Sequence, residues 1–239
     1  MTTRIVCHRG ACRAAPENTI ASGLAAAKLG GDIVELDVRQ SRDGVLYVLH
    51  DETVDRTTPF HGAIAKMDST TLDRLDAGAW YGPDFVGEPL PRLDAFFTAL
   101  SPHVDFYVEV KAARPEDVAA AIRRAGLAER CFVYSETPSL RQGLREAAPW
   151  LKRMVNWRDL DHMAEARTAE DAQIIEFHAE DMTPDRLETA AELGLEIMVH
   201  TARLDPEAFA AALNAEAHYL NIDHIDLAIE MRSELQCTA

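Results

Sequence analysis

Short apolar runs rich in β-branched residues alternate with longer runs rich in Ala, Leu, Glu and Arg, and this alternation constrains the fold more than any other feature of the chain. Strands are expected at residues 4–8, 32–38, 45–50, 104–111, 131–135, 152–156, 172–178, 195–200 and 218–222. Helices are expected at residues 19–29, 92–101, 115–126, 139–149, 183–194 and 205–217. Strands and helices that alternate at this spacing indicate an α/β protein with a parallel sheet.

Eight strand–helix units fit the chain if the second and third expected strands belong to one unit. The expected closure is therefore a (β/α)8 TIM barrel, formed by residues 1–239 as a single domain. An open, doubly wound sheet is the alternative. It is disfavoured because the first strand-to-helix turn, HRGACRAAPENT at residues 8–19, lacks the GxGxxG pattern that binds phosphate in such folds.

Residues 51–91 interrupt the alternation. This segment is rich in turn-forming residues and has little periodicity, and a loop of this length is usually functional or a small subdomain. Because it follows the strand that ends at His50, we expect a small inserted subdomain at the C-terminal rim of the barrel, over the active-site mouth. Its aromatic side chains either line a pocket or form a core of its own: Phe60, Trp80, Tyr81 and Phe85.

The charge balance limits the partners of the chain. The net charge is −16 at pH 7, whereas binding to nucleic acid or to an anionic membrane surface needs clustered Lys and Arg. No apolar stretch approaches the roughly 20 residues that span a bilayer, and the N-terminal residues show no signal-peptide pattern. We therefore expect neither nucleic-acid binding nor a stable membrane anchor, and an anionic substrate would need a local cationic site.

The cysteines bear on the cellular compartment. Four are present, without CxxC spacing and too few for a disulfide scaffold in a chain of this length: Cys7, Cys12, Cys131 and Cys237. Reduced thiols in a cytoplasmic protein are the simplest interpretation. The oligomeric state has no sequence signal.

Carboxylates occupy one face of two otherwise apolar strands. Glu35 and Asp37 alternate with apolar neighbours that suit the helix side, so both acids are expected to point into the barrel. The strand FYVEVK at residues 106–111 places Glu109 and Lys111 on one face in the same way. Neighbouring ionised carboxylates in a low-dielectric interior need a cation or a shared proton to relieve their repulsion.

Two kinds of site fit these acids equally well. Glu35, Asp37 and Glu109 make a candidate oxygen-ligand set for one hard divalent cation, Mg²⁺ or Ca²⁺, because no cysteine accompanies them. The alternative is a buried ion network in which Arg9 and Lys111 neutralise the acids.

Two histidines end expected strands near these acids. His8 and His50 are a candidate general acid and general base, because imidazole exchanges a proton near neutral pH. A metal ion with Arg9 and Lys111 would gather positive charge around a phosphate while the imidazoles move protons to and from the attacking and leaving oxygens. This chemistry fits phosphodiester cleavage better than acyl transfer, and the chain has neither a GxSxG turn nor a Walker-type loop.

Several motifs together resemble the glycerophosphodiester phosphodiesterase family in order and spacing. They are HRG at 8–10, PENT at 16–19, ELDV at 35–38, DG at 43–44, HDETVDRTT at 50–58, PRL at 91–93 and VEVK at 108–111. The motif-dense part covers the first 111 residues, and the later half is similar mainly in its β/α alternation. The resemblance implies a TIM barrel with a small insertion after the His50 strand.

The resemblance also implies roles for the acids and histidines. Glu35, Asp37 and Glu109 would hold one divalent cation, commonly Ca²⁺ or Mg²⁺. His8 and His50 would act in acid–base catalysis. The implied reaction is metal-dependent hydrolysis of a small-molecule glycerophosphodiester to sn-glycerol 3-phosphate and an alcohol such as choline or ethanolamine. The attacking oxygen would come from water or, through a cyclic phosphate, from the glycerol 2-hydroxyl.

The remaining polar residues of these motifs would bind the substrate. The resemblance implies that Arg9 and Lys111 contact phosphate and that Glu17, the glutamate of the PEN motif, belongs to the active site. Asn18, which follows it, is expected to be the N-cap of the next helix.

The C-terminal strands depart from the family pattern. Residues 197–200 read IMVH where the family usually reads WTVN, so Ile197 takes the tryptophan position and His200 belongs to a divergent strand. We expect the aromatic wall on the glycerol side to be missing or to be supplied by Trp80 or Trp157.

The last strand diverges as well. The segment HYLNIDHID at 218–226, which includes Asp223, stands where the family usually reads DGIITDxP. These departures put the substrate preference in question.

Two other functions stay open at the level of sequence. A lysophospholipase D-like or phosphoinositide phosphodiesterase would use the same chemistry on lipids, but the acidic chain offers no basic patch for a membrane. A non-catalytic barrel that binds metal or a phosphorylated metabolite is the other, and the presence of both His8 and His50 argues against it because binding alone needs no acid–base pair.

Overall fold

The computed structural model describes the backbone of residues 2–238 and the side chains of residues 2–236. Within this part of the chain one sheet contains the strands β1 (Arg4–Cys7), β2 (Ile33–Gln40), β3 (Leu46–Val48), β4 (Asp105–Ala112), β5 (Cys131–Tyr134), β6 (Lys152–Asn156), β7 (Ile174–His178), β8 (Glu196–Thr201) and β9 (Tyr219–Ile222). All except β3 are parallel, and they close in the order β1-β9-β8-β7-β6-β5-β4-β2 because β1 also pairs with β2. The closed parallel barrel confirms the expected TIM fold.

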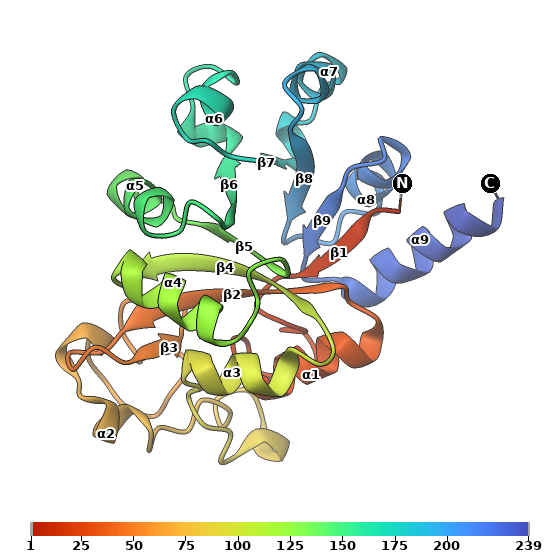
Figure 1. Cartoon of the computed structure of the whole chain (residues 1–239). Coiled ribbons are helices and arrows are strands. Elements are labelled where there is room, and N and C mark those ends of the chain that lie inside the picture. The colour runs from red at the N-terminus through yellow and green to blue at the C-terminus, as the bar shows by residue number, and fades with distance from the viewer. Residues whose placement is uncertain (1, 239) are drawn as a thin grey trace.

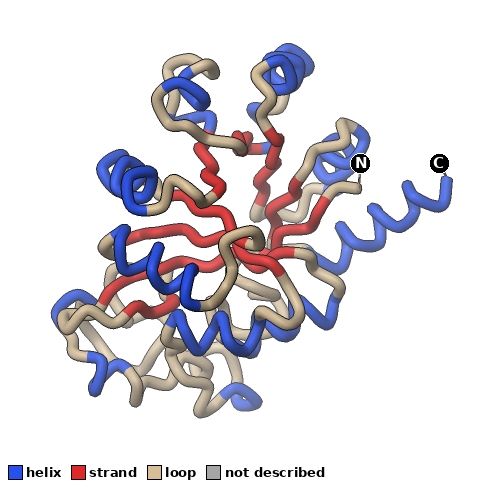
Figure 2. Tube along the Cα trace, viewed as in Figure 1, coloured by secondary structure: helices blue, strands red, loops and turns tan. Residues whose placement is uncertain are grey.

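Helices surround the barrel, as Figures 1 and 2 show. They are α1 (Ile20–Leu29), α2 (Ser69–Leu72), α3 (Leu93–Leu100), α4 (Pro115–Arg124), α5 (Pro138–Ala147), α6 (Glu165–Thr168), α7 (Pro184–Glu192), α8 (Pro206–Asn214) and α9 (Ile225–Thr238). The six expected helices lie close to their predicted positions, whereas α2, α6 and α9 were not predicted. No helix in the described residues is long and apolar enough to cross a membrane.

The strand β3 explains how nine strands yield eight barrel positions. It pairs antiparallel with β2, with Val38 opposite Val48, and so lies outside the closed ring. The second and third expected strands therefore form one unit, as predicted. The antiparallel return also brings Leu49 N to Asp37 O, at 2.9 Å. His50 consequently lies beside the middle of β2 instead of at the end of a barrel strand.

Two apolar layers show why the acids face inward. The larger one packs the sheet against the helices and takes Val34, Leu36 and Val38 of β2. The smaller one fills the barrel, with Val6, Ile33, Tyr107, Phe132, Tyr134, Met154, Ile174, Met198 and Tyr219. Because side chains alternate along a strand, the inward positions that follow Ile33 toward the end of β2 are Glu35 and Asp37.

The segment 51–91 packs on a small core of its own. This core consists of Tyr47, Leu49, Val54, Ile64, Leu72, Leu75, Ala77 and Leu90. Its two ends are adjacent, because Val48 N donates to Pro91 O at 3.0 Å. In Figure 1 the segment gathers around α2, on the side of the molecule opposite α7. These contacts agree with an inserted subdomain, whose boundaries stay a prediction.

The three cysteines whose side chains are described carry free thiols. Cys7 and Cys131 are buried, and Cys12 is partly buried. The side chain of Cys237 lies outside the described residues. Burial raises the pKa of each of the three thiols, so they are poor nucleophiles at neutral pH.

Candidate active site

A left-handed turn after β1 brings the main chain of the HRG motif to the acids. Arg9 and Gly10 have φ angles of 56° and 77°. A Cβ atom at Gly10 would lie 2.5 Å from Ser22 Oγ, so only glycine fits against the start of α1. In this turn Arg9 N donates a 2.7 Å hydrogen bond to Glu35 Oε2.

The prediction that Asn18 caps α1 is wrong. Asn18 has a φ angle of 58°, whereas an N-cap residue is extended, and Thr19 takes that role with a side chain that accepts from Ser22 N. The Asn18 side chain instead pairs with Asp37. Its Nδ2 donates to Asp37 Oδ2 at 2.8 Å, and its Oδ1 accepts from Asp37 N at 3.2 Å. Asn18 therefore orients one of the candidate metal ligands.

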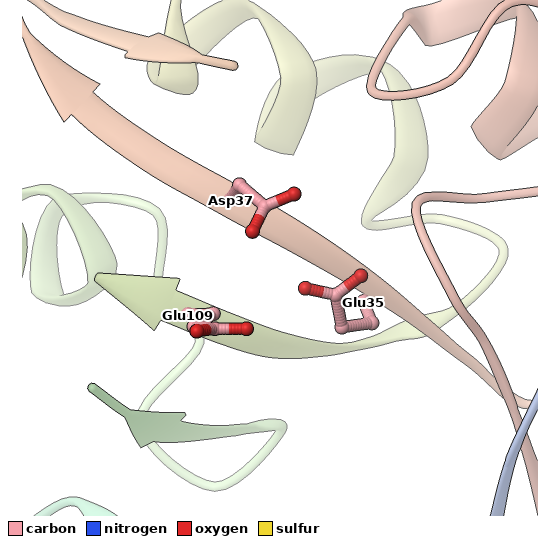
Figure 3. Close-up of side chains that lie close together, drawn as sticks. All are labelled: Glu35, Asp37 and Glu109. Atoms are coloured by element: carbon pink, nitrogen blue, oxygen red, sulfur yellow. The ribbon is translucent and has the colours of Figure 1, made fainter. Parts of the chain in front are cut away.

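The three predicted metal ligands lie together inside the barrel. Glu35 and Asp37 come from β2 and Glu109 from the neighbouring β4, where it stands opposite Asp37 (Figure 3). One oxygen from each lies within 4.8 Å of the others. Glu35 and Asp37 are each 1% exposed, and burial with the charges of Asp37 and Glu109 raises the pKa of Glu35 well above its usual value. The ionised acids destabilise one another here unless cations offset them.

Two cationic side chains reach the same cluster. Lys111 Nζ lies 2.5 Å from Glu109 Oε1 and 3.6 Å from Asp37 Oδ1. Arg9 Nε lies 3.5 Å from Asp37 Oδ2. Burial opposes the charge of Lys111, but the two carboxylates outweigh it and raise the lysine pKa. An ion network is thus present, and it leaves Glu35 Oε1 buried without a hydrogen-bond partner.

A carboxylate holds the ring of His8. Cys7 at the end of β1 pairs with Ile222 at the end of β9, which places the following residues, His8 and Asp223, side by side. His8 Nδ1 lies 2.7 Å from Asp223 Oδ1. Burial opposes ionisation of Asp223, but the hydrogen bond and charge of His8 outweigh it and lower the pKa of Asp223. The ring is fixed by Nδ1, so Nε2 is the nitrogen available to a substrate.

A neighbouring carboxylate, that of Asp51, holds the ring of His50 in the same manner. Its Nδ1 lies 2.7 Å from Asp51 Oδ1. Arg56 of the inserted segment donates from Nε to Asp51 at 2.7 Å and from both terminal nitrogens to Glu17 at 2.8 Å. Glu17 also accepts from Arg9 Nη1 at 3.0 Å. A chain of hydrogen bonds and ion pairs therefore runs from His50 through Asp51, Arg56 and Glu17 to Arg9.

The predicted site residues are brought together by these contacts. Contacts join Arg9, Glu17, Glu35, Asp37, Glu109, Lys111 and, through Asp51 and Arg56, His50 into one connected set. His8 lies next to this set as the chain neighbour of Arg9, and its own side-chain partner is Asp223. No hydrogen bond between described residues joins either imidazole directly to the three central acids. The contacts place these residues together, and the role of each is taken up as a proposal below.

Four further residues bond to the predicted site residues but were not predicted as functional: Asn18, Asp51, Arg56 and Asp223. Asp51 and Arg56 lie in the HDETVDRTT motif, which could have identified them. An acid directly after an expected strand was the available signal for Asp223. The partner of that acid depends on the closure of β1 against β9, which no local pattern gives.

Histidine rings gather in the C-terminal half of the barrel mouth. The ring of His200, on β8, contacts the ring of His8 edge-on with centroids 5.3 Å apart, and the ring of His178 at 5.5 Å. Burial, with the nearby His8 and His178, lowers the pKa of His200 to about 3, so its ring is neutral at working pH. Its Nδ1 is buried without a hydrogen-bond partner.

The residues expected near a missing aromatic wall do not form one. Ile197 packs in the layer between sheet and helices, and so does not face the mouth. Trp157 packs against Phe177 of that same layer and under the guanidinium of Arg186. Trp80 is 42% exposed and contacts the ring of its neighbour Tyr81. No contact in the described residues brings either tryptophan to the acids.

Comparison with known proteins identifies similar sequences. A sequence model of the glycerophosphoryl diester phosphodiesterase family matches residues 8–227. A glycerophosphodiester phosphodiesterase of Caldanaerobacter subterraneus is 36% identical over 64% of this chain and 65% of its own length. One from Bacillus subtilis is 37% identical over 44% of this chain and 39% of its own length. The chain thus matches less than two thirds of the length of either relative.

Solved structures are similar over nearly the whole fold. The crystal structure of a glycerophosphodiester phosphodiesterase from Agrobacterium tumefaciens has a TM-score of 0.92 and 40% identity, over 95% of this chain and 99% of that one. An Oleispira antarctica phosphodiesterase in complex with the product sn-glycerol-3-phosphate has a TM-score of 0.86 and 23% identity, over 98% and 97%. The second likeness supports the barrel fold alone.

Proposed function

The chain belongs to the glycerophosphoryl diester phosphodiesterase family, and from this premise we propose that it hydrolyses small-molecule glycerophosphodiesters to sn-glycerol 3-phosphate and an alcohol. One observation carries the proposal. Three carboxylates, two of them fully buried, converge beside two cationic side chains, and carboxylates hold the imidazoles of His8 and His50 nearby. The product complex of the Oleispira phosphodiesterase is consistent with this substrate class.

The acids suit a divalent metal ion. Glu35, Asp37 and Glu109 offer hard oxygen ligands, and the buried, unpartnered Glu35 Oε1 is a ligand atom that the protein itself leaves unused. We propose that these three side chains hold one Mg²⁺ or Ca²⁺. Such an ion, when bound, polarises a phosphoryl oxygen and offsets the charge that develops on it.

Cationic side chains would bind and orient the phosphate. Arg9 and Lys111 flank Asp37 on opposite oxygens, so an anion beside the acid cluster would meet a positive charge from each. Glu17 accepts a hydrogen bond from Arg9 and so holds its guanidinium in place. A low-dielectric site makes these charges more effective than they would be in water.

The two imidazoles would move the protons. One takes the proton from the attacking oxygen, and the other gives a proton to the alcohol oxygen as its bond to phosphorus breaks. Asp223 and Asp51 hold His8 and His50 by Nδ1, which directs Nε2 of each ring to this exchange. The attacking oxygen belongs to water or to the glycerol 2-hydroxyl, and ³¹P NMR distinguishes them because the second route passes through a cyclic phosphate.

We further propose a single domain over residues 1–239, with 51–91 as an inserted subdomain that carries Arg56 to the mouth. The free thiols of the described cysteines support the expected reducing, cytoplasmic location. The acidic charge of the chain supports the expectation that nucleic acid is not a partner.

The test is release of glycerol 3-phosphate from glycerophosphocholine. We compare the wild type, His8→Ala and His50→Ala, each with Mg²⁺, with Ca²⁺ and with EDTA. Loss of either proton-transfer group is expected to lower kcat by about 10²- to 10⁴-fold. EDTA is expected to abolish turnover, and the added metal to restore it.

The matched control is His61→Ala. His61 also pairs with a carboxylate, Asp55 at 3.2 Å, but on the exposed surface of the insertion, so its removal should leave kcat unchanged. Turnover that survived both active-site changes or full chelation would refute the mechanism. Cleavage of long-chain lysolipids alone would identify a lysophospholipase D-like enzyme, and metal binding without cleavage of any diester would identify a binding protein.

A further inference from the structure

A further cationic side chain, Arg39, lies at the barrel mouth, and the proposed mechanism does not use it. Arg39 follows Asp37 by two positions on β2, so strand alternation places both side chains on the same side of the sheet. Its antiparallel partner Tyr47 packs in the core of segment 51–91, whereas the next residue, Val48, packs in the layer against the helices. Arg39 is therefore directed away from the helices and toward the mouth.

The surroundings of Arg39 are acidic. Arg39 is partly buried, and its charge lies within electrostatic reach of four carboxylates: Asp37, Asp51, Glu52 and Glu109. In the part of the chain that the structure describes, it nevertheless forms a close ion pair with none of them. Instead, Arg39 Nε donates a 2.8 Å hydrogen bond to the main-chain oxygen of His50.

This main-chain oxygen lies where the chain leaves the sheet. β3 ends at Val48, and the pairing with β2 continues only to Leu49, whose N donates to Asp37 O at 2.9 Å. No main-chain N–H of the described residues donates to His50 O. A partly buried carbonyl needs a donor, and the side chain of Arg39 supplies it.

The hydrogen bond ties His50 to the strand that carries two of the proposed metal ligands. Asp51 holds the imidazole of His50 by Nδ1, but it is the next residue in the chain and moves with it. A bond between two chain neighbours cannot fix either of them relative to the barrel. Arg39 can do so, because its own main chain belongs to β2 together with Glu35 and Asp37.

We propose that Arg39 is a positioning residue, which fixes the main chain of His50 to β2 and so sets the place of its imidazole relative to the reacting phosphate. Arg56 supports the same histidine from the insertion, through Asp51. The two arginines thus anchor His50 to different parts of the molecule. Catalysis depends steeply on such placement, since an error of about 1 Å can cost about 10²-fold. The inference rests on the proposed function, and it assigns Arg39 no contact with the substrate.

Two neutral replacements separate the hydrogen bond from the charge. Arg39→Gln puts an amide N–H donor at the same position along the side chain as Arg39 Nε, whereas Arg39→Met puts a methyl group there. With glycerophosphocholine and saturating Mg²⁺ or Ca²⁺, Arg39→Met should lower kcat about fivefold to tenfold. Arg39→Gln should stay within about twofold of the wild type. KM should change little in either variant.

Equal losses of kcat in the two variants would show that the charge matters and not the hydrogen bond. A rise in KM without a loss of kcat would show that the guanidinium contacts the substrate directly. Either result would overturn the inference while leaving the proposed hydrolysis intact.

A double-mutant cycle tests whether Arg39 acts through His50. Arg39→Met added to His50→Ala should lower kcat no further, because the imidazole that Arg39 positions is already absent. A general structural role of Arg39 would instead multiply the two losses, and that outcome would contradict the proposal.

The matched control is Arg130→Met. Arg130 also donates to main-chain oxygens, those of Ser101 and Val104 at 2.8 Å, but it directly precedes β5, at the end of the barrel opposite the mouth. Its kcat should equal that of the wild type, with circular dichroism as the check on folding in every variant.

If the wild type cleaved no diester, the proposed function would fail, and the placement of His50 would be measured by NMR of its ring. Ring resonances that shift or broaden in Arg39→Met but not in Arg39→Gln would support the positioning role. Resonances that are unchanged in both variants, or changed equally in both, would refute it.

Discussion

Both halves of the barrel mouth bury carboxylates, but each half gives them different partners. In the N-terminal half, Glu35 and Asp37 face the cations Arg9 and Lys111. In the C-terminal half, Glu176 of β7 faces neutral amides, since Asn156 and Asn221 lie 3.0 and 3.4 Å from its oxygens.

The difference in partners separates two uses of a buried acid. Burial raises the pKa of Glu176, and the hydrogen bonds from its amide neighbours offset only part of that rise. An acid solvated by amides needs no ion, whereas three acids that share two cations retain unsatisfied negative charge. The N-terminal half therefore suits the proposed metal ion and phosphate, whereas Glu176 in the C-terminal half has its oxygens satisfied without either.

The largest expected effect tests this contrast directly. Glu35→Gln should lower kcat for glycerophosphocholine about 10³-fold, because it removes a proposed metal ligand beside the reacting phosphate. Glu176→Gln, an equally conservative change of a buried acid, should cost far less. Steady-state kinetics with saturating Mg²⁺ or Ca²⁺ measure both, with circular dichroism as the check on folding. Equal losses in the two variants would remove the distinction between the halves.

A smaller effect is expected from the link between the insertion and the N-terminal half. Arg56→Ala removes the hydrogen bonds to Asp51 and Glu17, so His50 and Arg9 lose their supports. We expect kcat to fall about 10- to 100-fold, as is usual for residues that orient a metal-site group.

The control is Arg42→Ala, which removes an exposed arginine paired with Asp68 elsewhere on the surface. Its kcat should match that of the wild type. An Arg56→Ala enzyme with full activity would show that the insertion does not position the site.

In the C-terminal half of the mouth, we expect His200 to make the folded protein less stable at acid pH. His200 has a pKa of about 3 in the folded protein, below the usual histidine value of 6.5, so between these values the unfolded chain binds the extra proton. Stability is therefore lost as pH falls below 6.5. Linkage gives a loss of about 2 kcal/mol between pH 7 and pH 5.

Chemical denaturation of the wild type and His200→Asn at both pH values isolates this contribution. The difference in unfolding free energy between the two proteins should change by about 2 kcal/mol in favour of the variant at pH 5. Other titrating groups, such as Glu35, act with the opposite sign but are common to both proteins and cancel. An unchanged difference would mean that His200 titrates normally.

Local periodicity was enough to predict much of the N-terminal half. The alternation around Glu35 and Asp37 identifies the inward face of β2, because a strand places alternate side chains on opposite sides whatever its neighbours are. Non-local pairing decided the rest. His8 meets Asp223 only because β1 closes against β9, and Leu49, the residue before His50, pairs with Asp37 only because β3 turns back along β2.

Asn18 shows how backbone conformation can override a local rule. Its residue type favours a helix cap, but the left-handed turn moves that task to Thr19 and frees the amide for Asp37. The sequence shows the residue type, but not the φ angle that decides which residue caps the helix.

The adjacent ends of segment 51–91 make it an exchangeable module. Val48 and Pro91 are joined by a hydrogen bond, so the chain leaves and re-enters the barrel at nearly one point. The part beyond Arg56 could therefore be replaced without changing the length of any barrel strand. Such a replacement would change the surface next to Arg56 and leave Glu35, Asp37 and Glu109 on their barrel strands.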